Sequence, residues 1–209
     1  MDKKAGYTFA IASIAMLVAV VSFISLVESP DVDWQLRIAN LNEQWLLISS
    51  IWRIEAICVI ALSWAAFHFA KSDSAWYLVG IGHIFMLTEY AVMLAGYPEV
   101  KTEEGFMLMN QLALWIFATS NFIWLIGMAL VYTRFFGWIK YAGIILASIS
   151  ATGFFGIFLG ILTMKHAMLA GPLAALLYVL NAWVGVRYLT SSSLEGQLES
   201  AGRQPSAAP

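Results

Sequence analysis

Two acids and one base interrupt the long apolar stretches of this chain. Arg53 and Glu55 lie in the stretch 46–70, and Glu89 lies in the next one, 76–96. An ionisable side chain in lipid is costly unless it is paired or hydrated, so such residues mark a polar site. The chemistry that these residue types offer is binding of a proton or cation by the carboxylates and of an anionic head group by the guanidinium.

The three side chains fall at a similar depth along the helices that these stretches predict, within ~3 Å of one another. An ion pair between Arg53 and Glu89 is therefore geometrically available. Positions two apart are separated by about 200° around a helix, so Glu55 needs its own partner, either Asn110, Gln111 or water. The set is either structural, fixing the helix register, or a polar pocket open to the outer face.

Motifs for catalysis or metal binding are missing from the sequence. His68, His83 and His166 are expected at three different depths, which argues against a shared haem or a zinc-binding triad. The single cysteine, Cys58, forms no internal disulfide. We expect no catalytic residues, no metal and no cofactor, and a non-enzymatic protein is favoured over an intramembrane enzyme that uses the carboxylates.

Small residues recur every fourth position in the stretch 138–164. They are Ser148, Thr152, Gly156 and Gly160. Such a stripe lets two helices approach closely. The neighbour is either another helix of the same bundle or the matching stripe of a second copy in a homodimer.

Composition shows which solvent these stretches face. Of 209 residues, 61% are hydrophobic and 11% are charged, and the mean hydropathy is +0.78. These values are typical of a polytopic membrane protein surrounded by lipid. The net charge of −2 gives no general attraction to nucleic acid.

The fold class predicted is all-α, with six transmembrane helices in one bundle over residues 1–190 and a disordered cytoplasmic tail at 191–209. The predicted spans are 7–27, 46–70, 76–96, 106–132, 138–164 and 167–189. Between the first two, the start signal Ser29–Asp31 is followed by Trp34, Ile38, Leu41 and Trp45, spaced like one face of a helix. We expect an amphipathic helix lying flat on the outer membrane surface.

Basic residues near the helix ends set the predicted orientation. One set of loops and ends holds seven of them (Lys3, Lys4, Lys71, Arg134, Lys140, Arg187 and Arg203) and the other holds three (Arg37, Lys101 and Lys165). The positive-inside rule then places both termini in the cytoplasm. We expect a multi-pass protein of the cytoplasmic (inner) membrane.

The later part of the chain resembles a family of six-helix bacterial membrane proteins catalogued as a domain of unknown function. The resemblance rests on Trp124-Leu-Ile-Gly127, Leu130-Val-Tyr132, Phe136-Gly-Trp-Ile-Lys140 and Gly143-Ile-Ile-Leu146 leading to Gly153. It implies a six-helix membrane architecture and implies no activity.

Two hypotheses for function follow. The first is a non-catalytic accessory subunit of a membrane complex or a binder of a lipid-like molecule, with membrane lipids, other subunits or a second copy as partners. The second is a small transporter or ion-coupled carrier that uses Arg53, Glu55 and Glu89 as an outward-facing polar site.

Overall fold

A computed structural model describes residues 3–26, 34–162 and 164–187, and every regular element in these ranges is a helix. The elements are α1 (Lys3–Leu26), α2 (Trp34–Glu43), α3 (Trp45–Phe69), α4 (Ala75–Gly96), the short 3-10 helix η1 (Tyr97–Glu99), α5 (Glu103–Tyr132), α6 (Trp138–Phe158) and α7 (Met164–Arg187). The prediction of an all-α protein is confirmed. The predicted start signal Ser29–Asp31 and the tail 191–209 lie outside the described residues.

Within residues 3–26, 34–162 and 164–187, five helices are long and apolar enough to cross a membrane: α1, α3, α4 together with η1, α5 and α6. Their outer surfaces are apolar as well, with exposed fractions of 67% for Ile11, 65% for Ile57 and 55% for Ile145. Lipid accepts such a surface, whereas water does not. A sixth crossing by α7 stays a prediction, because its described apolar part, Gly171–Arg187, is shorter.

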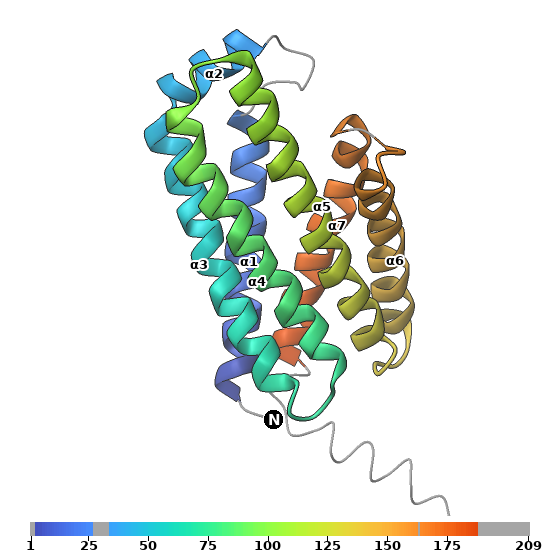
Figure 1. Ribbon diagram of the computed structural model, residues 1–209. Coiled ribbons are helices and arrows are strands. Elements are labelled where there is room, and N and C mark those ends of the chain that lie inside the picture. The colour runs from blue at the N-terminus through green and yellow to red at the C-terminus, as the bar shows by residue number, and fades with distance from the viewer. Residues whose placement is uncertain (1–2, 27–33, 163, 188–209) are drawn as a thin grey trace, which may run out of the picture.

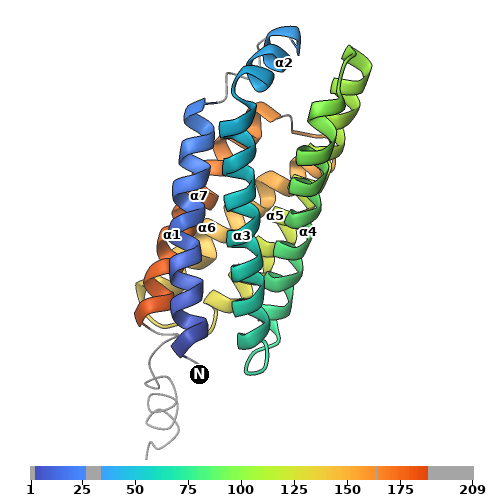
Figure 2. The same cartoon turned by 90° about the vertical axis from the view of Figure 1, so that its left-hand side faces the viewer.

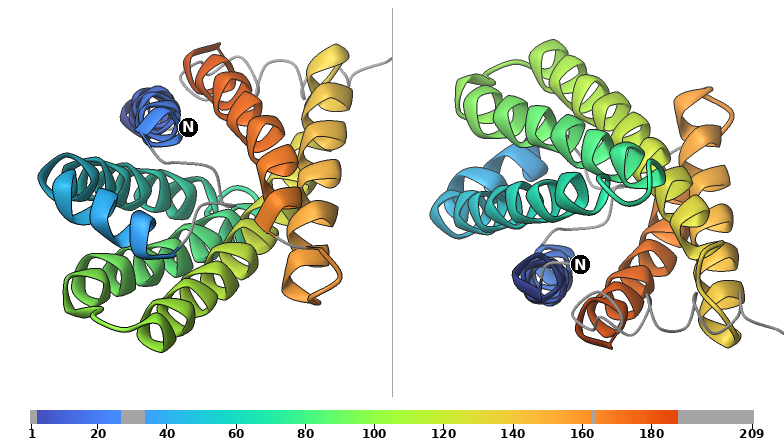
Figure 3. Two further views of the ribbon diagram at one scale, coloured as in Figure 1. Left: turned by 90° about the horizontal axis from the view of Figure 1, so that it is seen from above. Right: turned by 90° about the horizontal axis from the view of Figure 1, so that it is seen from below.

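The long helices form a closed cycle of neighbours. Each packs against the next in the order α1, α3, α4, α5, α6, α7, and α7 returns to pack against α1. Figure 3 shows this arrangement along the long axis of the bundle. Figures 1 and 2 show α2 at one end, above the start of α3, while the start of α1 lies at the opposite end.

Two glycines bring the backbones of α4 and α5 into direct contact. A Cβ atom at Gly82 would lie 2.5 Å from the backbone nitrogen of Trp124, and one at Gly127 would lie 2.7 Å from that of Val79. No side chain fits at either position, so the two helices cross more closely than larger residues allow. This crossing places Trp124 in the centre of the bundle, where it is fully buried.

The predicted end of the fifth span at residue 164 is wrong, because α6 ends at Phe158. Gly160 follows with a φ of 71°. Its N–H donates to the Ile157 carbonyl at 2.9 Å, and the N–H of Ile161 donates to the Gly156 carbonyl at 2.9 Å. These two hydrogen bonds are a Schellman motif, in which glycine stops a helix. Gly160 therefore terminates α6 and is not part of a helical stripe.

The other residues of the small-residue stripe lie away from the bundle interior. Ser148 and Thr152 are exposed on α6 and Gly156 is half-buried, whereas the preceding residues Ala147 and Ala151, about 100° around the helix, are buried. Among the described residues, α6 therefore packs through its alanine face. A contact between the stripe and a second copy stays a prediction.

The start of α5 lies three residues before the predicted one, at Glu103. Thr102 caps this helix, since its hydroxyl oxygen accepts a hydrogen bond of 3.2 Å from the N–H of Gly105. Glu103 and Glu104 in the first turn face the positive end of the helix dipole. The cap fixes where α5 begins after the short connection from η1, and Tyr97 of η1 packs on Phe106 in the first turns of α5, with ring centroids 6.2 Å apart.

Candidate functional site

Glu55 on α3 and Glu89 on α4 are buried side chains of two neighbouring helices. Only 5% of Glu55 and 8% of Glu89 is exposed. The two helices pack against each other, and the Glu55 carboxylate is close enough to act on the Glu89 carboxyl through its charge. The structure therefore brings these two predicted site residues together in one place inside the bundle.

Three further polar side chains lie within electrostatic reach of the Glu55 carboxylate: Cys58 of α3, Tyr90 of α4 and Tyr178 of α7. All three are buried. The Tyr90 hydroxyl lies within interaction distance of the Glu55 carboxylate. We call Glu55, Cys58, Glu89, Tyr90 and Tyr178 the acid cluster.

A fully buried tryptophan and histidine lie directly beside the acid cluster. The rings of Trp124 and Tyr178 stack with centroids 4.9 Å apart, and the His83 ring lies 5.5 Å from that of Trp124. The indole N–H of Trp124 and both ring nitrogens of His83 have no hydrogen-bond partner among the described residues, although the Val79 carbonyl lies near the histidine. Buried polar atoms of this kind are normally satisfied by water or a ligand.

Arg53 does not join the acid cluster. It is exposed on α3, and no ion pair links it to Glu89 in the described part of the chain. Because positions 53 and 55 point about 200° apart on a helix, burial of Glu55 turns Arg53 outward. Asn110 is half-buried and Gln111 is exposed on α5, and neither hydrogen-bonds to Glu55.

A second buried polar contact joins α5 to α7 at the end of the bundle away from α2. The Tyr132 hydroxyl donates a hydrogen bond of 2.7 Å to Oδ1 of Asn181. Asn121 instead donates to the Phe117 carbonyl of its own helix at 2.9 Å. In the described residues, no three His, Cys, Asp or Glu side chains come together in a way that fits a metal ion.

A cavity of about 70 Å³ opens beside α2, between the end of α1, the start of α3 and Tyr97 of η1. Its lining residues are Phe23, Leu26, Arg37, Asn40, Leu41, Ile48, Trp52 and Tyr97. Tyr97 connects this cavity to the acid cluster, because it is within electrostatic reach of both Arg37 and Glu89. Its ring also stacks on Trp52, with centroids 5.7 Å apart.

Comparison with known proteins does not place the chain in a family. No family model, curated protein or solved structure matches it. The resemblance to the six-helix bacterial family therefore stays a prediction. Any functional conclusion rests on the geometry of the acid cluster and of the cavity.

Sequence reasoning found the two glutamates but missed the residues around them. Tyr90 directly follows Glu89, and its place on the same helix could have been noticed. Tyr178 lies 123 positions beyond Glu55 in the chain, and only the return of α7 to α1 brings it to the cluster. The place of Arg37 in the lining of the cavity was missed, because its helix was interpreted only as a surface element.

Proposed function

We propose that this protein is a small ion-coupled membrane carrier whose acid cluster binds a proton or a small monovalent cation. The observation that carries the proposal is the burial of Glu55 and Glu89 on two helices that pack together, within electrostatic reach of each other. In the described part of the chain, neither takes part in an ion pair with a basic side chain. Intramembrane carboxylates in such a setting are typical of proton and ion pathways.

Electrostatics favours one bound positive charge at this cluster. Two buried carboxylates within reach of each other's charge repel each other more strongly than they would in water, because the dielectric constant of the protein interior is lower. Burial adds the cost of removing both charges from water. One proton or one monovalent cation bound by Glu55 and Glu89 reduces both the repulsion between the carboxylates and the cost of removing their charge from water. Binding and release of that ion is the step that a carrier couples to substrate movement.

The neighbouring hydroxyls give the ion a polar surrounding in an otherwise apolar bundle. Tyr90 lies within interaction distance of Glu55, and Tyr178 is within electrostatic reach of both glutamates. Tyr97 lines the cavity and is within electrostatic reach of Glu89. Tyrosine hydroxyls both donate and accept hydrogen bonds, so they suit a proton path as well as cation coordination. We propose that the ion enters from the cavity side through Tyr97.

The proposed carrier has six spans, including α7, with α2 flat on the outer surface of the cytoplasmic membrane and both termini inside. The position of the basic residues supports this orientation. Lys71, Arg134, Lys140 and Arg187 occur at helix ends or turns opposite α2 (Figure 1). Fewer basic residues lie at the α2 end, with Arg37 on α2 and Lys101 just before α5, as the positive-inside rule predicts for an outer face.

The accessory-subunit hypothesis is not supported by a specific contact surface in the described residues. Its lipid-binding part has one observation in its favour, the cavity beside α2. The cavity and the acid cluster have different lining residues and adjoin at Tyr97, so a carrier that also binds a lipid-like molecule is consistent with both.

Ion flux in proteoliposomes tests the carrier. Purified protein is reconstituted with a pH-sensitive or sodium-sensitive dye inside, and a potassium diffusion potential drives cation entry. We expect uptake above that of empty liposomes for the unaltered protein, and a loss of at least about tenfold in Glu55→Gln and Glu89→Gln. The matched control is Glu104→Gln, which removes an exposed acid outside the acid cluster.

Equal uptake by the two cluster variants and the unaltered protein would contradict the proposal. So would uptake no higher than that of empty liposomes for every cation tested. A loss in Glu104→Gln as large as in the cluster variants would assign the effect to surface charge and not to the buried site.

A further inference from the structure

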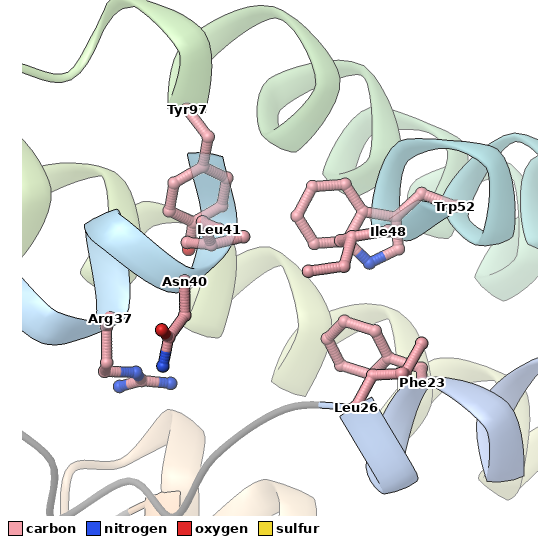
Figure 4. Close-up of a pocket in the computed structure, with 8 residues that line it drawn as sticks. All are labelled: Phe23, Leu26, Arg37, Asn40, Leu41, Ile48, Trp52 and Tyr97. Carbon is pink, nitrogen blue, oxygen red and sulfur yellow. The ribbon is translucent and has the colours of Figure 1, made fainter. Parts of the chain in front are cut away.

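The cavity beside α2 is divided into a polar and an apolar side. Figure 4 shows Arg37 and Asn40 next to each other on one side and Phe23 and Leu26 on the other. A volume of about 70 Å³ has room for several water molecules, or for a head group of carboxylate size. The cavity is open on one side, so a longer molecule can extend out of it.

Arg37 contributes a positive charge that no acid of the described chain neutralises. Its guanidinium lies over the Phe106 ring, 5.9 Å from the ring centroid, and it forms no ion pair with a described residue. It is half-buried, so water screens the charge only in part. A carboxylate or phosphate is the natural complement of such a guanidinium, since it accepts two parallel hydrogen bonds.

The apolar side of the cavity includes the buried ring of Trp52. Trp52 is 3% exposed and packs against three rings: Phe23 at 5.8 Å, Trp45 at 6.0 Å and Tyr97 at 5.7 Å between centroids. A wall held by several ring contacts needs little rearrangement to receive a ligand. Its chemistry suits an alkyl or aromatic body next to the anionic group.

We propose that this cavity is a binding site for an anionic amphiphile, a molecule with one carboxylate or phosphate head and an apolar body. Arg37 and Asn40 bind the head, while Phe23, Leu26 and Trp52 contact the first part of the body. The source is either a free fatty-acid-like molecule or the head group of an anionic membrane lipid. The proposal stands on the cavity alone and does not require the carrier function.

Photoaffinity labelling in nanodiscs distinguishes the two sources. One arm uses a fatty acid with a diazirine near its carboxylate, and the second uses an anionic phospholipid with a diazirine near its head group, both in phosphatidylcholine. The third arm uses the matching fatty alcohol, which lacks the charge. Peptide mass spectrometry then locates the adducts.

We expect adducts at the cavity, on the peptides that carry Phe23, Leu26 and Trp52, for at least one of the charged probes. The alcohol should label these peptides at least about tenfold less. Labelling by the fatty acid alone identifies a free amphiphile as the ligand, and labelling by the phospholipid identifies a lipid head group. Either result supports the site.

Variants separate the charge of Arg37 from a general effect of membrane cations. Arg37→Gln should reduce cavity labelling at least about tenfold, because it removes the charge and the paired donors that bind an anionic head group. Arg37→Lys keeps the charge and should keep more of the labelling. Arg53→Gln is the matched control, since Arg53 is exposed on α3 outside the cavity.

Equal labelling of the cavity peptides by the alcohol and the charged probes would overturn the proposal, and this comparison needs no variant. Adducts spread evenly over the lipid-facing helices would do the same. A loss of labelling in Arg53→Gln equal to that in Arg37→Gln would also contradict a specific site.

Discussion

Replacing Gly82 by alanine tests the close crossing of α4 and α5. This crossing places Trp124 against Tyr178 of the acid cluster. The new Cβ would lie 2.5 Å from the Trp124 nitrogen, 0.9 Å closer than the 3.4 Å at which ordinary contact begins. Overpacking of this kind costs about 1–3 kcal/mol. The obstructing atoms belong to the backbone and cannot move aside easily, so we take the upper value of about 3 kcal/mol for the overpacking cost. Alanine is a better helix former than glycine by about 1 kcal/mol, which offsets part of this cost. We expect a net loss of about 2 kcal/mol.

Cys58 offers a direct measurement of this loss. It is the one cysteine of the chain and only 6% exposed, so a thiol reagent reaches it when the core opens. When reclosing is faster than modification, the labelling rate follows the population of the open state. A loss of about 2 kcal/mol corresponds to labelling about 30-fold faster in Gly82→Ala.

Gly171→Ala is the matched control, because no atom lies within 4 Å of a Cβ at that position on α7. It should be labelled no faster than the unaltered protein. Labelling of Gly82→Ala at the rate of the unaltered protein, or more slowly, would refute the close crossing and with it the placement of Trp124.

Two further substitutions test the end of α6 and the contact between α5 and α7. Gly160→Ala forces a Cβ into a backbone conformation with φ of 71°, which costs about 1–2 kcal/mol. The midpoint of unfolding in a detergent titration should therefore fall, and an unchanged midpoint would contradict the Schellman motif at the end of α6. Tyr132→Phe removes the hydrogen bond of 2.7 Å to Asn181. A double-mutant cycle with Asn181→Ala, measured on the free energy of unfolding, should give a coupling energy of about 0.6–1.7 kcal/mol. Additive effects of the two substitutions would contradict the hydrogen bond.

The existence of the helices was predictable from sequence, but which face of each helix is buried was not. In water, the apolar face of a helix is the buried one, and a period of 3.6 residues reveals it. In these spans the lipid-facing side is apolar too: Ile57 is exposed and Val59 is buried on the same helix. The depth of each side chain along the helix axis was therefore predictable from its position in the sequence. The direction in which the side chain points around that axis was not.

This difference explains the outcome for Arg53. Its depth matched that of Glu89, so an ion pair was geometrically reasonable. The structure directs Glu55 inward, and positions two apart on a helix cannot both face the same neighbour. Once Glu55 is buried against α4, Arg53 is turned away.

The end of α6 was missed because a glycine that allows close helix packing and a glycine that ends a helix cannot be distinguished by sequence spacing alone. Gly156 and Gly160 are spaced as in a GxxxG packing motif. The apolar run also continues past Gly160, so hydropathy shows no break there. Only the positive φ and the two Schellman hydrogen bonds show that Gly160 stops the helix.

The electrostatic coupling of Glu55 and Glu89 is the central claim, and infrared difference spectroscopy of the reconstituted protein measures it most directly. A pH titration follows the carboxyl band of each acid, assigned by its loss in Glu55→Gln or Glu89→Gln. If the two acids share one site, replacing Glu55 removes a neighbouring charge, and the Glu89 band should titrate at a different midpoint from that in the unaltered protein. An identical Glu89 titration with and without Glu55 would contradict a shared ion-binding site.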